Sequence, residues 1–203
     1  MSLSILRSAV LCLCFLLVAC SDSPPLAPLP QGATILAFGD SLTRGTGAPP
    51  EQSYPAHLAR LTGFEVINAG VPGEVSAEGL ARLPEVLQQA QPDLIVLCHG
   101  GNDILRSLDK ATMLNNLQAM IDIARDSHTP VVLVAVPKRS LLLRAEPVYQ
   151  QLADTNSLPL QASVVADVLG DSELRSDRVH PNGAGYQIIA EAVYQLLQDS
   201  GAI

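Results

Sequence analysis

A serine stands at the point where the first buried strand of the chain is expected to end. Ser41 follows the apolar run Thr34–Ala37 in the stretch Phe38-Gly39-Asp40-Ser41-Leu42. A strand that stops at Gly-Asp and turns toward a helix would present the Ser41 hydroxyl at the carboxyl edge of an α/β sheet, where ligands usually bind. This hydroxyl is a candidate nucleophile, although Asp40 and Ser41 are also ordinary turn and N-cap residues.

A histidine and an aspartate near the end of the chain are the partners that a nucleophilic serine needs. Such a serine requires a base to take its proton and an acid to hold that base in the right tautomer. His180 differs from the other histidines because Asp177 precedes it by three residues and Pro181 stiffens the turn. Asp177 and His180 are therefore the candidate acid and base, and an incidental Asp and His in a loop is the alternative. Asp40 is then expected to hold its turn and not to join the chemistry.

Hydrogen-bond donors for a developing oxyanion follow each of the first three expected strands. Acyl transfer builds negative charge on the former carbonyl oxygen, and preorganised donors there contribute about 10²–10³ in rate. The Ser41 backbone N–H follows the first strand, Gly73 follows the second, and the Asn102 amide follows the third. A glycine lets substrate approach bare backbone, and simple turn geometry is the alternative explanation for it.

Strand and helix patterns alternate along the chain from Thr34 onward. The alternation predicts an α/β domain with a mostly parallel sheet covered on both faces, because parallel neighbours need crossovers that helices usually fill. The expected strands are Thr34–Ala37, Phe64–Ala69, Leu94–His99, Val131–Val136 and a short Leu158–Gln161, and the expected helices are Tyr54–Leu61, Ala77–Ala90, Lys110–Ser127, Glu146–Asn156, Val164–Leu169 and Gly183–Leu197.

The first residues have the pattern of an export signal that ends at a lipid attachment site. Arg7 gives a positive start, and Ala9–Ala19 is an apolar stretch of signal length, too short to span a membrane as a helix. Leu17-Val18-Ala19-Cys20 resembles the bacterial lipobox, which implies cleavage before Cys20 and acylation of that cysteine. The alternative is an ordinary signal peptide with a chance cysteine.

This interpretation divides the chain into three parts. We expect residues 1–19 to be a lipoprotein signal peptide, residues 20–32 a lipidated cysteine with a Pro-rich tether, and residues 33–203 the folded domain. Several acyl chains at Cys20 would make a stable membrane anchor. By resemblance to Gram-negative lipoproteins, Ser21 after the cysteine favours the outer membrane, so we expect a cell-envelope lipoprotein that faces the periplasm.

Cysteine use and net charge exclude several classes of protein. Cys12 and Cys14 leave with the signal, so Cys98 is the only cysteine of the expected domain and no intrachain disulfide framework is possible. Cys98 ends an apolar run and is expected to be a small buried hydrophobe, and no Cys/His spacing suggests a metal site. The net charge of −8 carries no basic stripe, so nucleic acid is not an expected partner.

The candidate residues resemble a known family when they are taken together. They occur in the order and approximate spacing of the four blocks of the SGNH, or GDSL, hydrolase family. Within it, Ala77–Pro84 and Gly100–Asp103 are similar to the branch that contains thioesterase I/lysophospholipase L1 and related bacterial arylesterases. The four blocks are Gly39-Asp40-Ser41-Leu42, Asn68-Ala69-Gly70 with Gly73, Gly101-Asn102-Asp103, and Asp177 with His180.

The resemblance implies a three-layer α/β/α, flavodoxin-like fold and a catalytic role for each candidate residue. Ser41 would be the nucleophile, His180 the base and Asp177 its partner. The oxyanion hole would be formed by the N–H groups of Ser41 and Gly73 and by the Asn102 amide. No metal or organic cofactor is expected.

One departure from the branch lies just before the third block, where Cys98-His99 replaces an acidic and an aliphatic residue. His99 either shapes or hydrogen-bonds near an acyl pocket, or has a structural role or partial exposure.

The leading functional hypothesis is a membrane-tethered serine esterase that hydrolyses small acyl esters or thioesters through an acyl-Ser41 intermediate. One alternative is a carbohydrate O-acetylesterase acting on peptidoglycan or exopolysaccharide. Another is a non-catalytic lipoprotein that uses the fold as a binding module. Leu141–Leu143 slightly favours an acyl-chain pocket, and a core role for these leucines is the alternative. The sequence does not indicate an oligomeric state.

Overall fold

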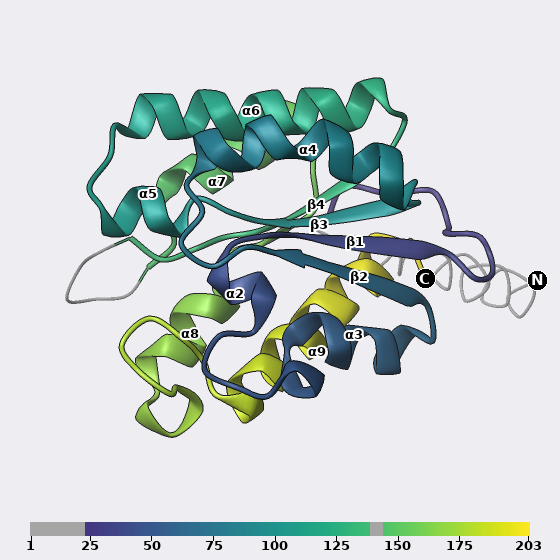
Figure 1. Ribbon diagram of the computed structural model, residues 1–203. Coiled ribbons are helices and arrows are strands. Elements are labelled where there is room, and N and C mark those ends of the chain that lie inside the picture. The colour runs from purple at the N-terminus through teal and green to yellow at the C-terminus, as the bar shows by residue number, and fades with distance from the viewer. Residues whose placement is uncertain (1–22, 139–143) are drawn as a thin grey trace, which may run out of the picture.

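A computed structural model describes residues 23–138 and 144–203 of the chain (Figure 1). The expected signal peptide and the expected lipid site Cys20 lie outside the described residues, as does the Leu141–Leu143 stretch.

The described residues form a five-stranded sheet in which every pairing is parallel, in the order β2-β1-β3-β4-β5. The predicted α/β fold with a mostly parallel sheet is therefore confirmed. The two strands that follow β1 in the chain lie on either side of it, so the chain leaves β1 in opposite directions and opens a crevice at its carboxyl end. The strands are β1 (Thr34–Gly39), β2 (Glu65–Gly70), β3 (Leu94–Cys98), β4 (Val131–Val134) and β5 (Leu160–Gln161).

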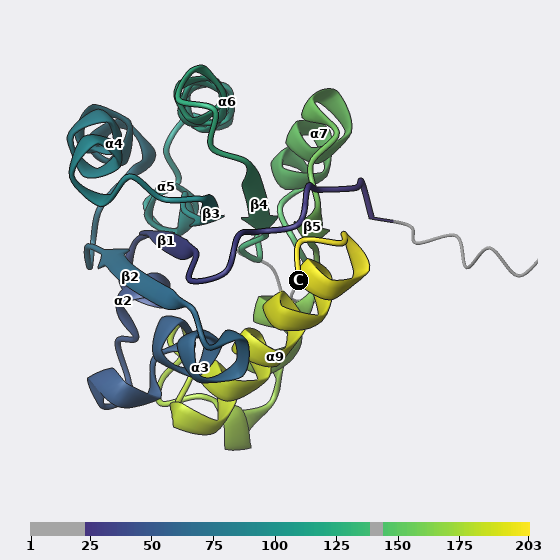
Figure 2. The ribbon, with the colours of Figure 1, turned by 90° about the vertical axis from the view of Figure 1, so that its right-hand side faces the viewer.

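Helices cover both faces of the sheet (Figure 2), which makes three layers. Because β1, β3 and β4 are covered on both sides, nearly all of their side chains are buried, and their sequences are continuous apolar runs. One layer holds α4 (Ser76–Ala90), α5 (Gly101–Leu105), α6 (Lys110–Asp126) and α7 (Pro147–Asn156). The other holds α2 (Ser41–Arg44), α3 (Tyr54–Thr62), α8 (Val164–Gly170) and α9 (Gly183–Asp199), beside the short 3₁₀ turns η1 (Pro50–Gln52) and η2 (Ser172–Leu174).

Local capping chemistry places the ends of the helices. The Asp109 carboxylate accepts a hydrogen bond from the Thr112 N–H at 2.7 Å and starts α6. The Asn182 side chain does the same for α9 with the Gly185 N–H at 3.1 Å. Gly63 ends α3 in the left-handed region at φ 72°, where a glycine carries no steric penalty.

Several boundaries differ from those that the sequence predicts. The helix α5 was not predicted, because its five residues are too few to show a periodic pattern. The fourth strand ends at Val134 instead of Val136, and Pro137 beyond it makes an antiparallel bridge to Ala145. The fifth strand begins at Leu160 instead of Leu158, since Pro159 has no N–H to donate to a ladder.

The segment expected to be a Pro-rich tether is attached to the folded unit in its second half. The Leu26 N–H donates to the Ser200 carbonyl and the Leu29 N–H to the Ala202 carbonyl, each at 2.8 Å. Both leucines are partly buried and pack against the core, which gives an apolar reason for the attachment. The folded unit therefore begins before the expected boundary at Ala33. The attached segment lies at the amino edge of the sheet, on the side opposite α2 and α5 in Figure 1.

Within residues 23–138 and 144–203, no helix combines the length and the apolar character that crossing a membrane requires.

Candidate active site

Ser41 is the first residue of α2 and lies at the carboxyl end of β1. Asp40 precedes it as the N-cap, and its carboxylate accepts a hydrogen bond from the Leu42 N–H at 3.0 Å. Asp40 is only 1% exposed, and this burial raises the pKa of its carboxyl group. Asp40 thus holds the turn that presents Ser41, which is the role that the sequence predicts for it.

The loop before α9 brings His180 to the Ser41 hydroxyl. The His180 Nε2 atom lies 3.1 Å from the Ser41 Oγ, and the Nδ1 atom lies 2.8 Å from the Asp177 Oδ2. The other oxygen of Asp177 accepts the backbone N–H groups of Val179 at 2.7 Å and His180 at 2.9 Å. A tight local loop therefore fixes the carboxylate against the imidazole ring.

The ionisation of Asp177 determines the tautomer of His180. Burial opposes ionisation of Asp177, but the hydrogen bonds from the His180 ring and from the backbone outweigh it and lower the pKa of the carboxyl group. An ionised carboxylate only accepts hydrogen bonds, so the proton of a neutral His180 ring lies on Nδ1. Nε2 then carries a lone pair directed at the Ser41 hydroxyl, as a general base requires.

Ser41 and His180 open into a cavity of about 580 Å³. Its wall is mainly apolar, which suits an acyl chain or an aromatic ring better than a free sugar. The lining also includes the basic side chains of Lys138 and Arg178. The apolar lining consists of Leu42, Ile104, Leu105, Val136, Pro137, Leu169 and Val179.

Of the two expected oxyanion donors besides Ser41, Asn102 lines the cavity and Gly73 does not. Asn102 lines the cavity, and its Nδ2 donates to the Glu74 carbonyl at 3.0 Å and more weakly to the Asp40 Oδ2 at 3.4 Å. Gly73 lies outside the cavity lining, next to Glu74 in the loop after β2, at φ +82°. Its carbonyl accepts a hydrogen bond from Arg106 at 2.8 Å. Of the donors predicted from sequence, Gly73 is therefore the one that the cavity does not include.

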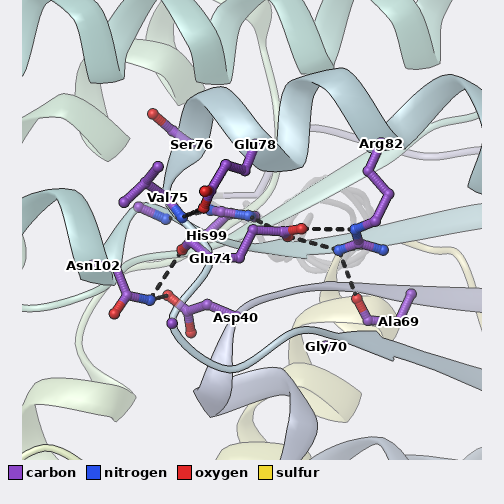
Figure 3. A network of polar contacts seen from close by, with 12 residues as sticks. Asp40, Ala69, Gly70, Glu74, Val75, Ser76, Glu78, Arg82, His99 and Asn102 are labelled. Atoms are coloured by element: carbon purple, nitrogen blue, oxygen red, sulfur yellow. Dashed lines mark hydrogen bonds and ion pairs between the residues drawn. The ribbon is translucent and has the colours of Figure 1, made fainter.

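His99 is completely buried and does not line the cavity, so it contributes to the structure and not to an acyl pocket. Its Nε2 lies 3.0 Å from the Glu74 Oε2, and Arg82 makes two hydrogen bonds to the same carboxylate at 2.8 and 2.7 Å. We call Glu74, Arg82 and His99 the carboxylate cluster (Figure 3). Sequence reasoning missed Glu74 and Arg82. The one available signal was a histidine at the end of an otherwise apolar strand.

The carboxylate cluster keeps Glu74 ionised. Burial opposes its ionisation, but the hydrogen bonds from Arg82 and His99 outweigh it and lower the pKa of Glu74 to about 2 from the ordinary value of 4.5. A carboxyl group whose pKa is depressed in the folded state stabilises that state above its unfolded pKa. This stabilisation is lost as the pH falls through the folded pKa.

We predict that Glu74→Gln lowers the free energy of unfolding at neutral pH, and that this difference from the wild type shrinks by on the order of 3 kcal/mol as the pH falls from 4.5 toward 2. Urea unfolding at several pH values measures it. Glu85→Gln, on the exposed face of α4, is the matched control and should show no such trend. A Glu74→Gln difference that stays constant with pH would contradict the assignment.

Among the described residues, no group of three or more His, Cys, Asp and Glu side chains is arranged to hold a metal ion.

Comparison with known proteins gives concordant matches. The sequence model of the GDSL-like Lipase/Acylhydrolase family matches residues 37–188. The arylesterase of Vibrio mimicus is 34% identical over 175 residues, which cover 80% of this chain and 87% of that protein. Thioesterase 1/protease 1/lysophospholipase L1 of Escherichia coli (strain K12) is 28% identical over 173 residues, covering 81% and 83%. A crystal structure of the psychrotrophic esterase EstA from Pseudoalteromonas sp., inhibited by monoethylphosphonate, has a TM-score of 0.72 at 26% identity and covers 82% of this chain and 97% of that one.

Proposed function

The chain belongs to the GDSL-like lipase/acylhydrolase family and is a serine hydrolase of the esterase and thioesterase type, and from this premise we propose that Ser41, His180 and Asp177 carry its reaction. The observation that supports the assignment best is the continuous line from the Ser41 Oγ through both ring nitrogens of His180 to the Asp177 carboxylate. The Ser41 end of this line opens into a mainly apolar cavity at the crevice beside β1.

The proposed reaction has two stages. The Ser41 Oγ attacks the acyl carbonyl carbon while His180 Nε2 takes the hydroxyl proton, and the ring passes that proton to the departing alcohol or thiol. Water then attacks the acyl-Ser41 ester, His180 takes the water proton and returns it to the Ser41 oxygen, and the carboxylic acid leaves. Asp177 stabilises the imidazolium that forms in each stage.

We assign the stabilisation of the oxyanion to the N–H groups of Ser41 and Gly73 and to the Asn102 amide. Within the described residues, neither of these two N–H groups donates to an acceptor, so neither is committed to another partner. The Asn102 amide is anchored by its 3.0 Å bond to the Glu74 carbonyl. Its 3.4 Å contact to Asp40 is long for a hydrogen bond. The amide hydrogen that faces Asp40 is therefore the one that would be donated to a substrate oxygen.

A substrate panel tests the proposed function. We expect the purified protein to release p-nitrophenol from acetate, butyrate and octanoate esters and to cleave acyl thioesters, because the cavity wall is apolar. Acetylated xylan and acetylated peptidoglycan are included. Release of acetate from the glycans alone would favour the O-acetylesterase alternative. No turnover of any substrate by folded protein, together with no labelling by a fluorophosphonate, would favour a binding module.

We propose further that Cys20 anchors the enzyme to the outer membrane so that it faces the periplasm. The support is the lipobox-like sequence and the way the chain leaves the domain. Leu26 is only six positions after Cys20 and is bound to Ser200 at the amino edge of the sheet. Residues that line the cavity follow the carboxyl ends of β1, β3 and β4, so an anchor at Cys20 would direct the cavity away from the membrane and toward substrates in the periplasm.

Cys20→Ser tests the anchor. It is expected to move the protein from the membrane pellet into the soluble fraction and from the detergent to the aqueous phase of Triton X-114. The kcat for p-nitrophenyl butyrate should not change, because the residues that line the cavity lie between Asp40 and His180 in the chain. A Cys20→Ser protein that still partitions with membranes would contradict the proposed anchor.

A further inference from the structure

The carboxylate cluster contacts each of the three segments that supply the proposed oxyanion donors. Glu74 follows Gly73 in the loop after β2, and His99 directly follows β3, three residues before Asn102. Arg82 lies over the ring of Phe38 in β1, with its guanidinium carbon 4.3 Å from the ring centroid. The His99 ring stacks on the same Phe38 ring at 5.9 Å between centroids. Figure 3 shows Glu74 between Arg82 and His99.

Backbone and side-chain bonds fix the orientation of the His99 ring. The Gly100 N–H donates to the His99 Nδ1 at 2.8 Å, so the proton of the ring lies on Nε2 and is donated to the Glu74 Oε2 at 3.0 Å. The Tyr149 hydroxyl donates to the His99 carbonyl at 2.7 Å. Helix α4 leaves room for the ring at Gly79, where a Cβ atom would overlap the His99 Nε2. The imidazole is therefore a fixed link between the Glu74 carboxylate and the turn that begins at Gly100.

Three further hydrogen bonds join the same segments. The Asn102 Nδ2 donates to the Glu74 carbonyl at 3.0 Å, as described above. The Asp103 carboxylate accepts the Ser76 N–H at 2.8 Å and the Ser76 hydroxyl at 2.6 Å. The loop that carries Gly73 and the turn that carries Asn102 are thus connected through both the side chain and the carbonyl of Glu74.

The cluster is not explained by stability alone. A buried charged group costs desolvation energy, and a well-packed apolar residue of similar volume is often as stabilising as a buried ion pair. The Glu74 side chain is only 6% exposed, so its carboxylate carries that cost, and the His99 ring that it contacts is 0% exposed. Directional bonds to a carboxylate can specify a position, which apolar contacts do less well.

We propose that Glu74 and His99 are positioning residues for the oxyanion hole, setting the distance between the Gly73 N–H and the Asn102 amide. The inference rests on the proposed oxyanion roles of Gly73 and Asn102, and it goes beyond them by assigning the geometry to residues outside the cavity. Because oxyanion donors act in the transition state, loss of the link should lower kcat and leave KM largely unchanged.

Two substitutions test the inference in the full protein. His99→Leu and Glu74→Gln are each expected to lower kcat for p-nitrophenyl butyrate by about 10-fold to 10²-fold, less than the 10²–10³-fold expected for Asn102→Ala, with KM changed by less than about threefold. The rate of fluorophosphonate labelling should fall in parallel, since the phosphonyl oxygen occupies the oxyanion position. The pH profile of kcat/KM should keep its shape, because neither substitution touches the line from Ser41 to Asp177.

Further variants separate positioning from a general packing role. His99→Gln keeps a donor directed at Glu74 and should recover part of the kcat that His99→Leu loses. Glu85→Gln should leave kcat unchanged. Circular dichroism and the melting temperature establish that each variant is folded at the assay temperature.

The outcomes distinguish failure of this inference from failure of the proposed function. Full kcat in folded His99→Leu and Glu74→Gln, beside a large loss in Asn102→Ala, would overturn the positioning role and leave the proposed function intact. A loss of kcat that is accompanied by an altered pH profile, or that His99→Gln does not relieve, would also overturn it. Undiminished turnover by Ser41→Ala would instead overturn the proposed function.

Discussion

Ser41→Ala is expected to lower kcat/KM for p-nitrophenyl butyrate by about 10⁴-fold or more, because the substitution removes the atom that forms the acyl bond. The fold should be preserved. Ser41 is the first residue of α2, and the N-cap bond that starts this helix comes from Asp40 to the Leu42 N–H. We expect the melting temperature to change little and the substrate to bind still in the cavity. Initial rates at several substrate concentrations measure the loss.

Ser172→Ala is the matched control for this experiment, since Ser172 lies at an exposed position in η2 and outside the cavity lining. It should retain the wild-type rate. If Ser41→Ala kept a rate within about tenfold of the wild type, another residue would be the nucleophile.

Asp177→Asn is expected to lower kcat by about 10²-fold to 10⁴-fold through the tautomer of His180. The asparagine carbonyl oxygen can still accept the N–H groups of Val179 and His180, so the loop should keep its shape. Its amide nitrogen would then replace the Oδ2 atom that faces His180 Nδ1. An amide donates where a carboxylate accepts, so the ring proton would move to Nε2 and the ring would lose its lone pair toward Ser41.

Steady-state kinetics across pH measure the loss of kcat in Asp177→Asn. Asp154→Asn, on the exposed face of α7, is the control. The loss should appear in kcat, with KM nearly unchanged, because the exposed Asp177 side chain is not part of the cavity lining. A kcat within about twofold of the wild type would show that His180 needs no acidic partner.

Much of the fold could be predicted from the sequence because its strands are buried on both faces. The residues of β1, β3 and β4 form short apolar runs that end at glycine or proline signals, and helical periodicity fills the intervals. The attachment of Leu26 and Leu29 to the last residues of the chain could not be predicted. It depends on contacts between the two ends of the folded unit, and the prolines around these leucines are also typical of a free linker.

The same difference applies to the candidate site, where contacts within one loop could be predicted and contacts between distant segments could not. Asp177 and His180 are three residues apart, so one loop brings them together and the sequence pattern is sufficient. Glu74 and His99 are 25 residues apart and meet only because β2 and β3 both end beside β1. A single sequence showed a histidine in an unusual place but gave no indication of its partner. The departure from the family pattern at His99 was the useful signal.

Covalent labelling identifies the nucleophile of the reaction. The purified protein is treated with a fluorophosphonate, its intact mass is measured, and the adduct is located by peptide sequencing in a mass spectrometer. One phosphonyl group per chain is expected on the Ser41 oxygen, formed far more slowly in Asp177→Asn and absent from Ser41→Ala. An adduct on any other residue, or none on folded protein that hydrolyses p-nitrophenyl butyrate, would contradict this assignment.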